Sequence, residues 1–398
     1  MGSEQATVEQ IVKPPHGLTN AKLVLGMGGL AIGTGEFAAM GLLPSMADSF
    51  DISVSEAGYG VIAYAFGVVI GGPFLAVLTA HLPRQRVLIG LLAIVLAGNL
   101  ATALAPEMIC WLTARFISGI PHGTYYGIAS LVAASMVPKG QRASAIGQVM
   151  LGLAVANLLG VPFSTWLGQV AGWETTFLVI SVIALVTLAL TFYFIPFVAG
   201  DSTATPIKEL GVLKQADVWA TLLVATIGFA GMFSLYSYIT PSLQNLTGMA
   251  ESTVPWMLMA WGAGMVIGNI VGGKCADRAM VPSLYGILIW NALFLAAFAF
   301  FATDIWSSVI LLFLIGCGFA LVPALQSRLM DVASNAQSLG ATLNHSAFNL
   351  SNALGAWLGG IALSVGFGWE SPAIVGAVLA AIGIPVFALS LVLARREG

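Results

Sequence analysis

Two charged side chains lie deep within long apolar stretches, where charge is costly, and their chemistry is that of proton transfer. Glu36 lies between Gly35 and Phe37, and Arg115 lies beside Phe116. An acid inside a membrane segment is by default a candidate for an ion pathway or a proton relay. An acid beside an arginine keeps its charge, and it takes up a proton when the arginine moves away. The pair therefore indicates proton coupling; the alternative is a static ion pair that fixes helix packing.

Helix geometry predicts similar depths for the two charges. Glu36 lies about 15 Å from an outer end at Met46, and Arg115 lies about 12 Å from Glu107, at 1.5 Å per residue. His122 follows Arg115 by about two turns, and a histidine titrates near neutral pH. We therefore include His122 in the proton-coupling set. A substrate contact and a structural hydrogen bond between helices are the alternatives for His122.

A second polar cluster lies between residues 344 and 352. His345, Asn349 and Asn352 follow the i, i+4, i+7 spacing and share one helix face. This face is expected either to line a polar cavity or to make hydrogen bonds between helices. Aromatic side chains are further candidates for a cavity wall, with packing or lipid contact as the alternative. The candidate substrate-binding residues are Tyr64, Tyr125, Tyr126, Phe233, Tyr236, Asn344, His345 and Asn349.

The elements that carry these residues can be read from the charges. The chain is 58% hydrophobic and 8% charged, which excludes a soluble domain. Runs free of Asp, Glu, Lys and Arg cover 57–83, 87–106, 143–173, 175–200, 218–250, 252–273, 279–303, 305–327, 332–369 and 371–394, and runs with one charge cover 23–47 and 108–138. Each reaches the roughly 20 residues that a membrane-spanning helix needs. The sequence therefore predicts an all-α membrane protein with twelve transmembrane helices.

The basic residues predict the orientation. When the loops are assigned alternately to the two sides, 13 of the 14 Lys and Arg residues fall on one side, and the fourteenth is Arg115. The positive-inside rule places that side, with both termini, in the cytoplasm. No secretory signal peptide is evident in residues 1–20. We therefore predict a multi-pass protein of the bacterial cytoplasmic (inner) membrane.

The two halves of the chain repeat each other. At an offset of 197, Pro44 matches Pro241, Gly67-to-Gly71 matches Gly264-to-Gly268, and Phe116 matches Phe313; at 195, Asn157 matches Asn352. Six spans in each half make these parallel repeats, which place a substrate site between two bundles near the midplane. The expected domains are a tail (1–20), a six-helix bundle (21–197), a linker (198–216), a second six-helix bundle (217–394) and a tail (395–398). Within the linker, 206–214 is expected to form a short amphipathic helix. Glu36 maps onto Phe233, so the acid belongs to one half only.

Signatures of catalysis are absent from the sequence. There is no HExxH pattern, Walker loop or cysteine-pair constellation. We therefore expect no enzyme, metal site, cofactor or nucleic-acid partner. The expected partners are a small-molecule substrate, protons and the lipid bilayer, and a monomer suffices.

Several short segments together resemble the major facilitator superfamily. They include Gly35-Glu36-Phe37, Arg115 to Gly119, Gly160 to Pro162 and Phe348-Asn349. The similarity covers about 20–395 and is to the twelve-helix drug/proton antiporter branch, in particular to bacterial permeases for sugar (arabinose-type) and chloramphenicol efflux. In this family the span-four arginine is associated with proton coupling, and Arg115 matches it. Glu36 matches the span-one acid of the efflux permeases.

The resemblance also implies a conformational latch. The family's loop signature Gly-x-x-x-Asp-Arg is kept at Gly273, Asp277 and Arg278, but the loop at 79–86 lacks the acid. A latch of the usual kind is therefore expected at Asp277 and Arg278, and its counterpart in the amino-terminal half is in doubt. The function predicted is proton-coupled export of a small neutral or amphiphilic compound by alternating access. The alternative is an uncoupled facilitator or importer of a small polar solute, with Glu36 structural.

Overall fold

The computed structural model describes residues 12–52, 54–200, 205–250, 253–333 and 336–397, and all regular elements within them are helical. The amino-terminal bundle contains α1 (Leu18–Phe50), α2 (Val54–Ala57), α3 (Tyr59–Phe66), η1 (Gly67–Gly71), α4 (Gly72–Thr79), α5 (Arg84–Ala103), α6 (Met108–Gly119), α7 (His122–Ser135), η2 (Lys139–Gln141), α8 (Arg142–Val155), η3 (Ala156–Gly160), α9 (Val161–Ala171) and α10 (Trp173–Phe194). Colinear pieces such as α3–η1–α4 make up single spans.

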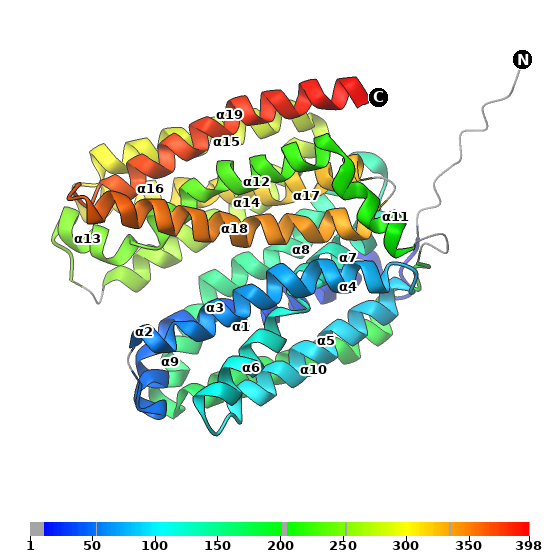
Figure 1. Cartoon of the computed structure of the whole chain (residues 1–398), viewed down its shortest axis with the longest axis horizontal. Helices are drawn as coiled ribbons and strands as arrows, with labels where there is room; N and C mark the ends of the chain where they lie inside the picture. The colour runs from blue at the N-terminus through cyan, green and yellow to red at the C-terminus, as the bar shows by residue number, and fades with distance from the viewer. Residues whose placement is uncertain (1–11, 53, 201–204, 251–252, 334–335, 398) are drawn as a thin grey trace, which may run out of the picture.

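The linker and the carboxyl-terminal bundle follow. They contain α11 (Pro206–Gly211), η4 (Val212–Lys214), α12 (Ala216–Tyr236), α13 (Ile239–Thr247), α14 (Val254–Arg278), α15 (Met280–Phe301), α16 (Ile305–Cys317), η6 (Gly318–Ala320), α17 (Leu321–Val332), α18 (Gln337–Ser364) and α19 (Ser371–Glu397). Figure 1 shows the two bundles side by side, with α11 at the end of the molecule where α19 ends. We call this the linker end, and the opposite end, near α2 and α13, the distal end.

Each predicted span corresponds to one helical segment. Ten segments within the described residues are long and apolar enough to cross a membrane. The other two predicted spans are α6–α7, which is interrupted at Ile120 and Pro121, and α18, which carries the polar cluster of residues 344–352. Large apolar side chains such as Phe192, Phe300 and Trp306 are exposed on the outside of the bundles, as lipid contact requires. The predicted all-α membrane fold is confirmed.

The bundles contact each other mainly toward the linker end. There α4 and α7 pack on α18, while α8 packs on α14 and α17; toward the distal end the ribbons of α2 and α9 diverge from α13 (Figure 1). A Cβ atom at Gly127 of α7 would lie 2.7 Å from Thr342 Oγ1 of α18. Such an approach requires glycine, because small residues let helix backbones come together in a membrane.

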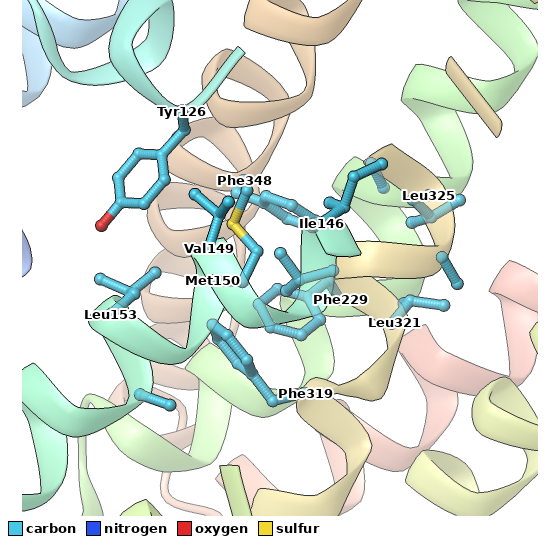
Figure 2. Close-up of a cluster of buried hydrophobic side chains, with 14 of the residues drawn as sticks. Tyr126, Ile146, Val149, Met150, Leu153, Phe229, Phe319, Leu321, Leu325 and Phe348 are labelled. Atoms are coloured by element: carbon cyan, nitrogen blue, oxygen red, sulfur yellow. The ribbon is translucent and has the colours of Figure 1, made fainter. Parts of the chain in front are cut away.

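Apolar side chains fill the contact between α8 and α17 on the linker-end side of the interface. Ile146, Val149 and Met150 of α8 meet Leu321 and Leu325 of α17, and all five are buried. Figure 2 shows them converging from both bundles, with Leu153, Phe229, Phe319 and Phe348 around them. We call the first five residues the apolar seal. Dense apolar packing of this kind excludes water from the linker end of the interface.

Two spans contain π-helical turns that the sequence analysis did not predict. They are η1, followed by Pro73, and η3, followed by Pro162. Proline lacks an N–H group and clashes with the carbonyl one turn before it, and a π-turn is one way to accommodate it. An extra residue per turn also rotates the face that the rest of the helix presents.

Three boundaries differ from those expected. Helix α1 begins at Leu18 rather than 21, and α12 begins at Ala216 rather than 217. Helix α19 continues to Glu397 instead of ending at 394. The expected linker helix of 206–214 is present as α11 followed by η4, and its burial does not simply follow polarity. Glu209 is buried and Leu210 is exposed.

Candidate functional site: a cavity between the bundles

A cavity lies between the two bundles at the depth of Glu36. The lining residues are Glu36, Phe37, His122, Leu153, Asn157, Phe229, Met232, Phe233, Tyr236, Trp261, Met265, Phe319, Val322, His345, Phe348, Asn349 and Asn352. Its volume is about 60 Å³, whereas sites that hold drug-sized ligands measure roughly 300–1,000 Å³. The cavity must therefore widen before it can hold such a compound.

Glu36 and His122 face each other on the amino-terminal side of this cavity. Glu36 lies near the middle of α1, and its Oε2 atom is 3.8 Å from His122 Nδ1. His122 is the first residue of α7, directly after the interruption at Ile120 and Pro121. Both side chains are buried. Local breakage of the fourth span therefore sets the histidine opposite the acid.

A tyrosine hydroxyl also reaches this histidine. Tyr64 Oη lies 3.0 Å from His122 Nδ1, and the hydroxyl donates when that nitrogen carries no proton. A proton that moves to His122 Nδ1 would displace this hydrogen bond and leave the nitrogen facing Glu36. Tyr64 thus holds the ring in place from the third helix of the chain, although it does not line the cavity.

The guanidinium of Arg115 hydrogen-bonds to a backbone carbonyl and not to the Glu36 carboxylate. Its Nη1 atom donates to the backbone carbonyl of Gly35 at 2.9 Å, and its guanidinium carbon lies 4.6 Å from the centre of the Tyr64 ring and 5.5 Å from that of Phe177. The side chain is completely buried. Aromatic faces stabilise a guanidinium through cation–π attraction. Arg115 therefore holds the α1 backbone one residue from the acid and acts on its charge without direct contact.

His345 extends this group into the other bundle. Its ring stacks on Tyr126 with centroids 4.4 Å apart and an interplanar angle of 13°, and its centroid lies 5.4 Å from that of His122. His345 Nε2 has no hydrogen-bond partner among the described residues. Glu36, His122 and His345 thus form a row that crosses from the amino-terminal to the carboxyl-terminal bundle.

Some of the candidate residues lie elsewhere. The Tyr125 hydroxyl donates to Leu25 O at 2.9 Å, and Asn344 Nδ2 donates to Gln326 Oε1 at 2.6 Å; neither residue lines the cavity. Tyr126 donates to Gly29 O and reaches the site through its ring contacts with His345 and His122. Six of the predicted residues do line it: Glu36, His122, Phe233, Tyr236, His345 and Asn349.

Several lining residues were absent from the candidate set. Asn157 and Asn352 line the cavity from opposite bundles, and the sequence repeat had already paired them. Phe229 and Trp261 line it as well, but an apolar helix gives no sign of which aromatic side chain faces inward. The site combines one acid, two histidines and three amides with an aromatic wall. Once widened, such a lining suits a partly apolar solute, and the acid and the histidine beside it are groups that can exchange a proton.

The predicted latch residues lie at the linker end. The Asp277 carboxylate accepts hydrogen bonds from the backbone of Ala143 and Ser144 at 2.8 and 3.0 Å, and one from the Ser144 hydroxyl. Arg278 is the last residue of α14 and is exposed. Within the described residues, no group of three or more His, Cys, Asp or Glu side chains could hold a metal ion.

A pair of six-helix repeats that encloses a cavity near mid-depth is the architecture of rocking membrane transporters. The sequence model of the Major Facilitator Superfamily matches residues 25–344 and 222–398, so the chain belongs to this family. Membership makes it a multi-pass membrane transporter of small solutes, and not an enzyme.

Two curated relatives come from Escherichia coli (strain K12). The inner membrane transport protein YdhP is 39% identical over 376 residues, covering 94% of this chain and 96% of the relative. The putative transporter AraJ is 29% identical over 359 residues, covering 90% and 91%.

Solved structures share the fold at low sequence identity. The E. coli fucose:proton symporter FucP has a TM-score of 0.75 at 14% identity and covers 93% of this chain and 98% of its own. The human organic anion transporter MFSD10 has a TM-score of 0.76 at 15% identity and covers 94% and 100%.

Proposed function

We propose that this transporter exports a small neutral or amphiphilic compound in exchange for protons, by alternating access. A chloramphenicol-like drug and a sugar are the two substrate classes to test. We further propose that it works as a monomer in the bacterial cytoplasmic (inner) membrane, with both termini in the cytoplasm. The observation that carries the proposal is the buried carboxylate of Glu36 inside the cavity, 3.8 Å from His122 Nδ1.

In this cycle Glu36 is protonated in one part of the cycle and ionised while the substrate is bound. A proton from outside binds Glu36 and favours the state that turns toward the cytoplasm. Substrate that enters from the cytoplasm promotes release of that proton, with His122 as the nearest group to receive it. Arg115, fixed to Gly35, favours the ionised acid while substrate is carried. The proposed substrate wall is the cavity face formed by Phe233, Tyr236 and Asn349, together with His345.

The test measures two activities separately in proteoliposomes: accumulation of substrate driven by a pH gradient, and exchange of labelled for unlabelled substrate without a gradient. Radiolabelled chloramphenicol and arabinose serve as probes, with wild type and Glu36→Gln compared. One proton per substrate across one pH unit sustains up to about a tenfold concentration ratio, since about 1.4 kcal/mol corresponds to a factor of ten. We expect wild type to approach this ratio for the accepted probe and Glu36→Gln to remain near one. Exchange of labelled for unlabelled substrate moves no net proton and should survive in Glu36→Gln.

The alternative is an uncoupled facilitator or importer in which Glu36 is structural. It predicts that Glu36→Gln loses exchange together with net transport, and that a protonophore leaves wild-type transport unchanged. Gradient-driven accumulation that persists in Glu36→Gln would contradict the proposed role of the acid.

A further inference from the structure

Carboxylates from different elements meet the amino ends of two helices at the linker end. Asp277, near the end of α14, accepts from the backbone N–H groups of Ala143 and Ser144, at the start of α8. The first N–H groups of a helix have no partner within it, and a carboxylate there is favoured by the helix dipole. This contact joins the carboxyl-terminal bundle to the amino-terminal one.

The internal repeat specifies where a symmetric contact should be. The offset of 197 maps Asp277 onto Ala80, and the offset of 195 maps Ser144 onto Leu339, near the start of α18. The symmetric contact would therefore run from residue 80 to the amino end of α18. A methyl group accepts no hydrogen bond, so Ala80 cannot make it.

Glu209 supplies the carboxylate that is missing there. Its Oε2 atom accepts from the backbone N–H of Leu339 at 3.2 Å, and the residue is only 2% exposed. Glu209 belongs to α11, in the linker rather than in either bundle. The amino ends of α8 and α18 thus meet equivalent groups, one from α14 and one from the linker.

The linker is also tied to the amino-terminal bundle. The backbone N–H of Arg84, at the start of α5, donates to Val198 O at 2.8 Å. Helix α11 packs on both α4 and α18. The linker therefore connects the α4–α5 loop of the amino-terminal bundle to Leu339 of the carboxyl-terminal bundle. The Asp277 contact connects the carboxyl-terminal bundle to the start of α8 in the amino-terminal one.

We propose that Glu209 is a positioning residue of the transport cycle: it replaces the acid absent at position 80 and makes the linker one of the two latches that hold the linker end closed. A contact made in only one of two states shifts the population toward that state. When the linker end opens, α18 must leave α4 and α7, so the Glu209–Leu339 bond must break. The linker is then a working part of the gate and not only a tether.

The test measures the closed population directly. Spin labels are attached at Arg86→Cys and Ala279→Cys, exposed positions on the two bundles at the linker end, after Cys110, Cys275 and Cys317 are replaced by serine. Distance distributions are recorded in lipid nanodiscs for the otherwise wild-type protein, Glu209→Ala, Glu209→Gln and the neighbouring control Leu210→Ala. A charged hydrogen-bonded group of this kind typically shifts a two-state ratio about tenfold or more.

We expect Glu209→Ala to shift the ratio about tenfold toward the longer distance. Glu209→Gln should shift it less, because its amide oxygen still accepts a hydrogen bond. Leu210→Ala should leave it unchanged. The double variant Glu209→Ala with Ala80→Asp should return toward the wild-type distribution, because it restores a carboxylate at the repeat position.

Two results would overturn the proposal: Glu209→Ala and Glu209→Gln both matching Leu210→Ala, or a double variant as open as Glu209→Ala. If Glu209→Ala does not fold, Glu209→Gln is compared with Leu210→Ala and with the double variant Glu209→Gln, Ala80→Asp in the same way. The measurement uses neither substrate nor a proton gradient, so it stands or falls separately from the proposed proton-coupled export.

Discussion

The contact between Gly127 and Thr342 gives a direct way to reverse the side to which the cavity opens. Gly127 lies in α7 and Thr342 in α18, so the contact joins the two bundles at the linker end. A Cβ at Gly127 would lie 2.7 Å from Thr342 Oγ1 and 3.0 Å from Thr342 N, closer than the 3.4 Å at which ordinary contact begins. The backbone nitrogen cannot rotate away, so the helices must separate.

The size of the effect follows from that clash. Overpacking by one methyl group typically costs about 1–3 kcal/mol. The clash exists only while the linker end is closed, so we expect Gly127→Ala to shift the closed-to-open ratio by roughly 5- to 150-fold. Alanine is otherwise the better helix former by about 1 kcal/mol, which argues against general unfolding. Gly90→Ala is the matched control, because nothing lies within 4 Å of its added Cβ.

A cysteine at position 352 reports the change, since Asn352 lines the cavity and is partly exposed. The variants carry Asn352→Cys in the background free of native cysteines. A membrane-impermeant maleimide is added to vesicles of either orientation. With the apolar seal intact, labelling is expected from the distal side; Gly127→Ala should move it to the linker side, and Gly90→Ala should not. Equal labelling patterns in both glycine variants would refute the assignment of this contact as a closing one.

Two further predictions concern single side chains. Tyr64→Phe removes the hydroxyl that lies 3.0 Å from His122 Nδ1. We expect a several-fold fall in proton-driven transport and a displaced pH profile of transport, while thermal stability changes little. An unchanged pH profile would exclude a role of the hydroxyl in proton transfer. At the start of α16, outside the membrane spans, backbone hydrogen bonds from Ser307 and Trp306 hold the pKa of Asp304 below its ordinary value of 3.8. Asp304→Ala should therefore lower the melting temperature at neutral pH. Because a lowered carboxyl pKa stabilises the fold above the unfolded value and loses that effect as pH falls through the folded one, the difference between the proteins should shrink below pH 3.8.

Much of the architecture was predictable because charge is so costly in a membrane. The charge-free runs located each span, and the matching words at offsets of 197 and 195 indicated two related bundles. The depth of Glu36 and its position beside a cavity followed from the same reasoning. These features depend on the cost of placing charged side chains in the membrane and on the periodicity of the chain, and both can be read from residue types and positions.

Side-chain partners were less predictable. Arg115 and Glu36 lie at similar depths, but periodicity does not say whether the guanidinium meets the carboxylate or the carbonyl of Gly35. Asn344 lies next to His345 in sequence, but it faces Gln326 on another side of α18. The π-turn η3 rotates the fifth span, so a face assigned by a constant 3.6-residue period is lost beyond it. The sequence predicted a short amphipathic helix over 206–214, but nothing in it shows that Glu209 reaches α18.

The cavity walls are divided unequally between the two halves of the chain. Among the described residues, Phe37 is the one Phe, Tyr or Trp of the amino-terminal half that lines the cavity, whereas the other half supplies Phe229, Phe233, Tyr236, Trp261, Phe319 and Phe348. The two repeats therefore differ in what they contribute: the acid lies in one half, and most of the proposed substrate wall lies in the other. On the proposed function, substitutions in the carboxyl-terminal half are expected to alter the compound that is carried while the acid stays in place. If the proposed substrate wall is correct, a chimera that takes only its carboxyl-terminal half from a relative should carry the relative's substrate and keep Glu36.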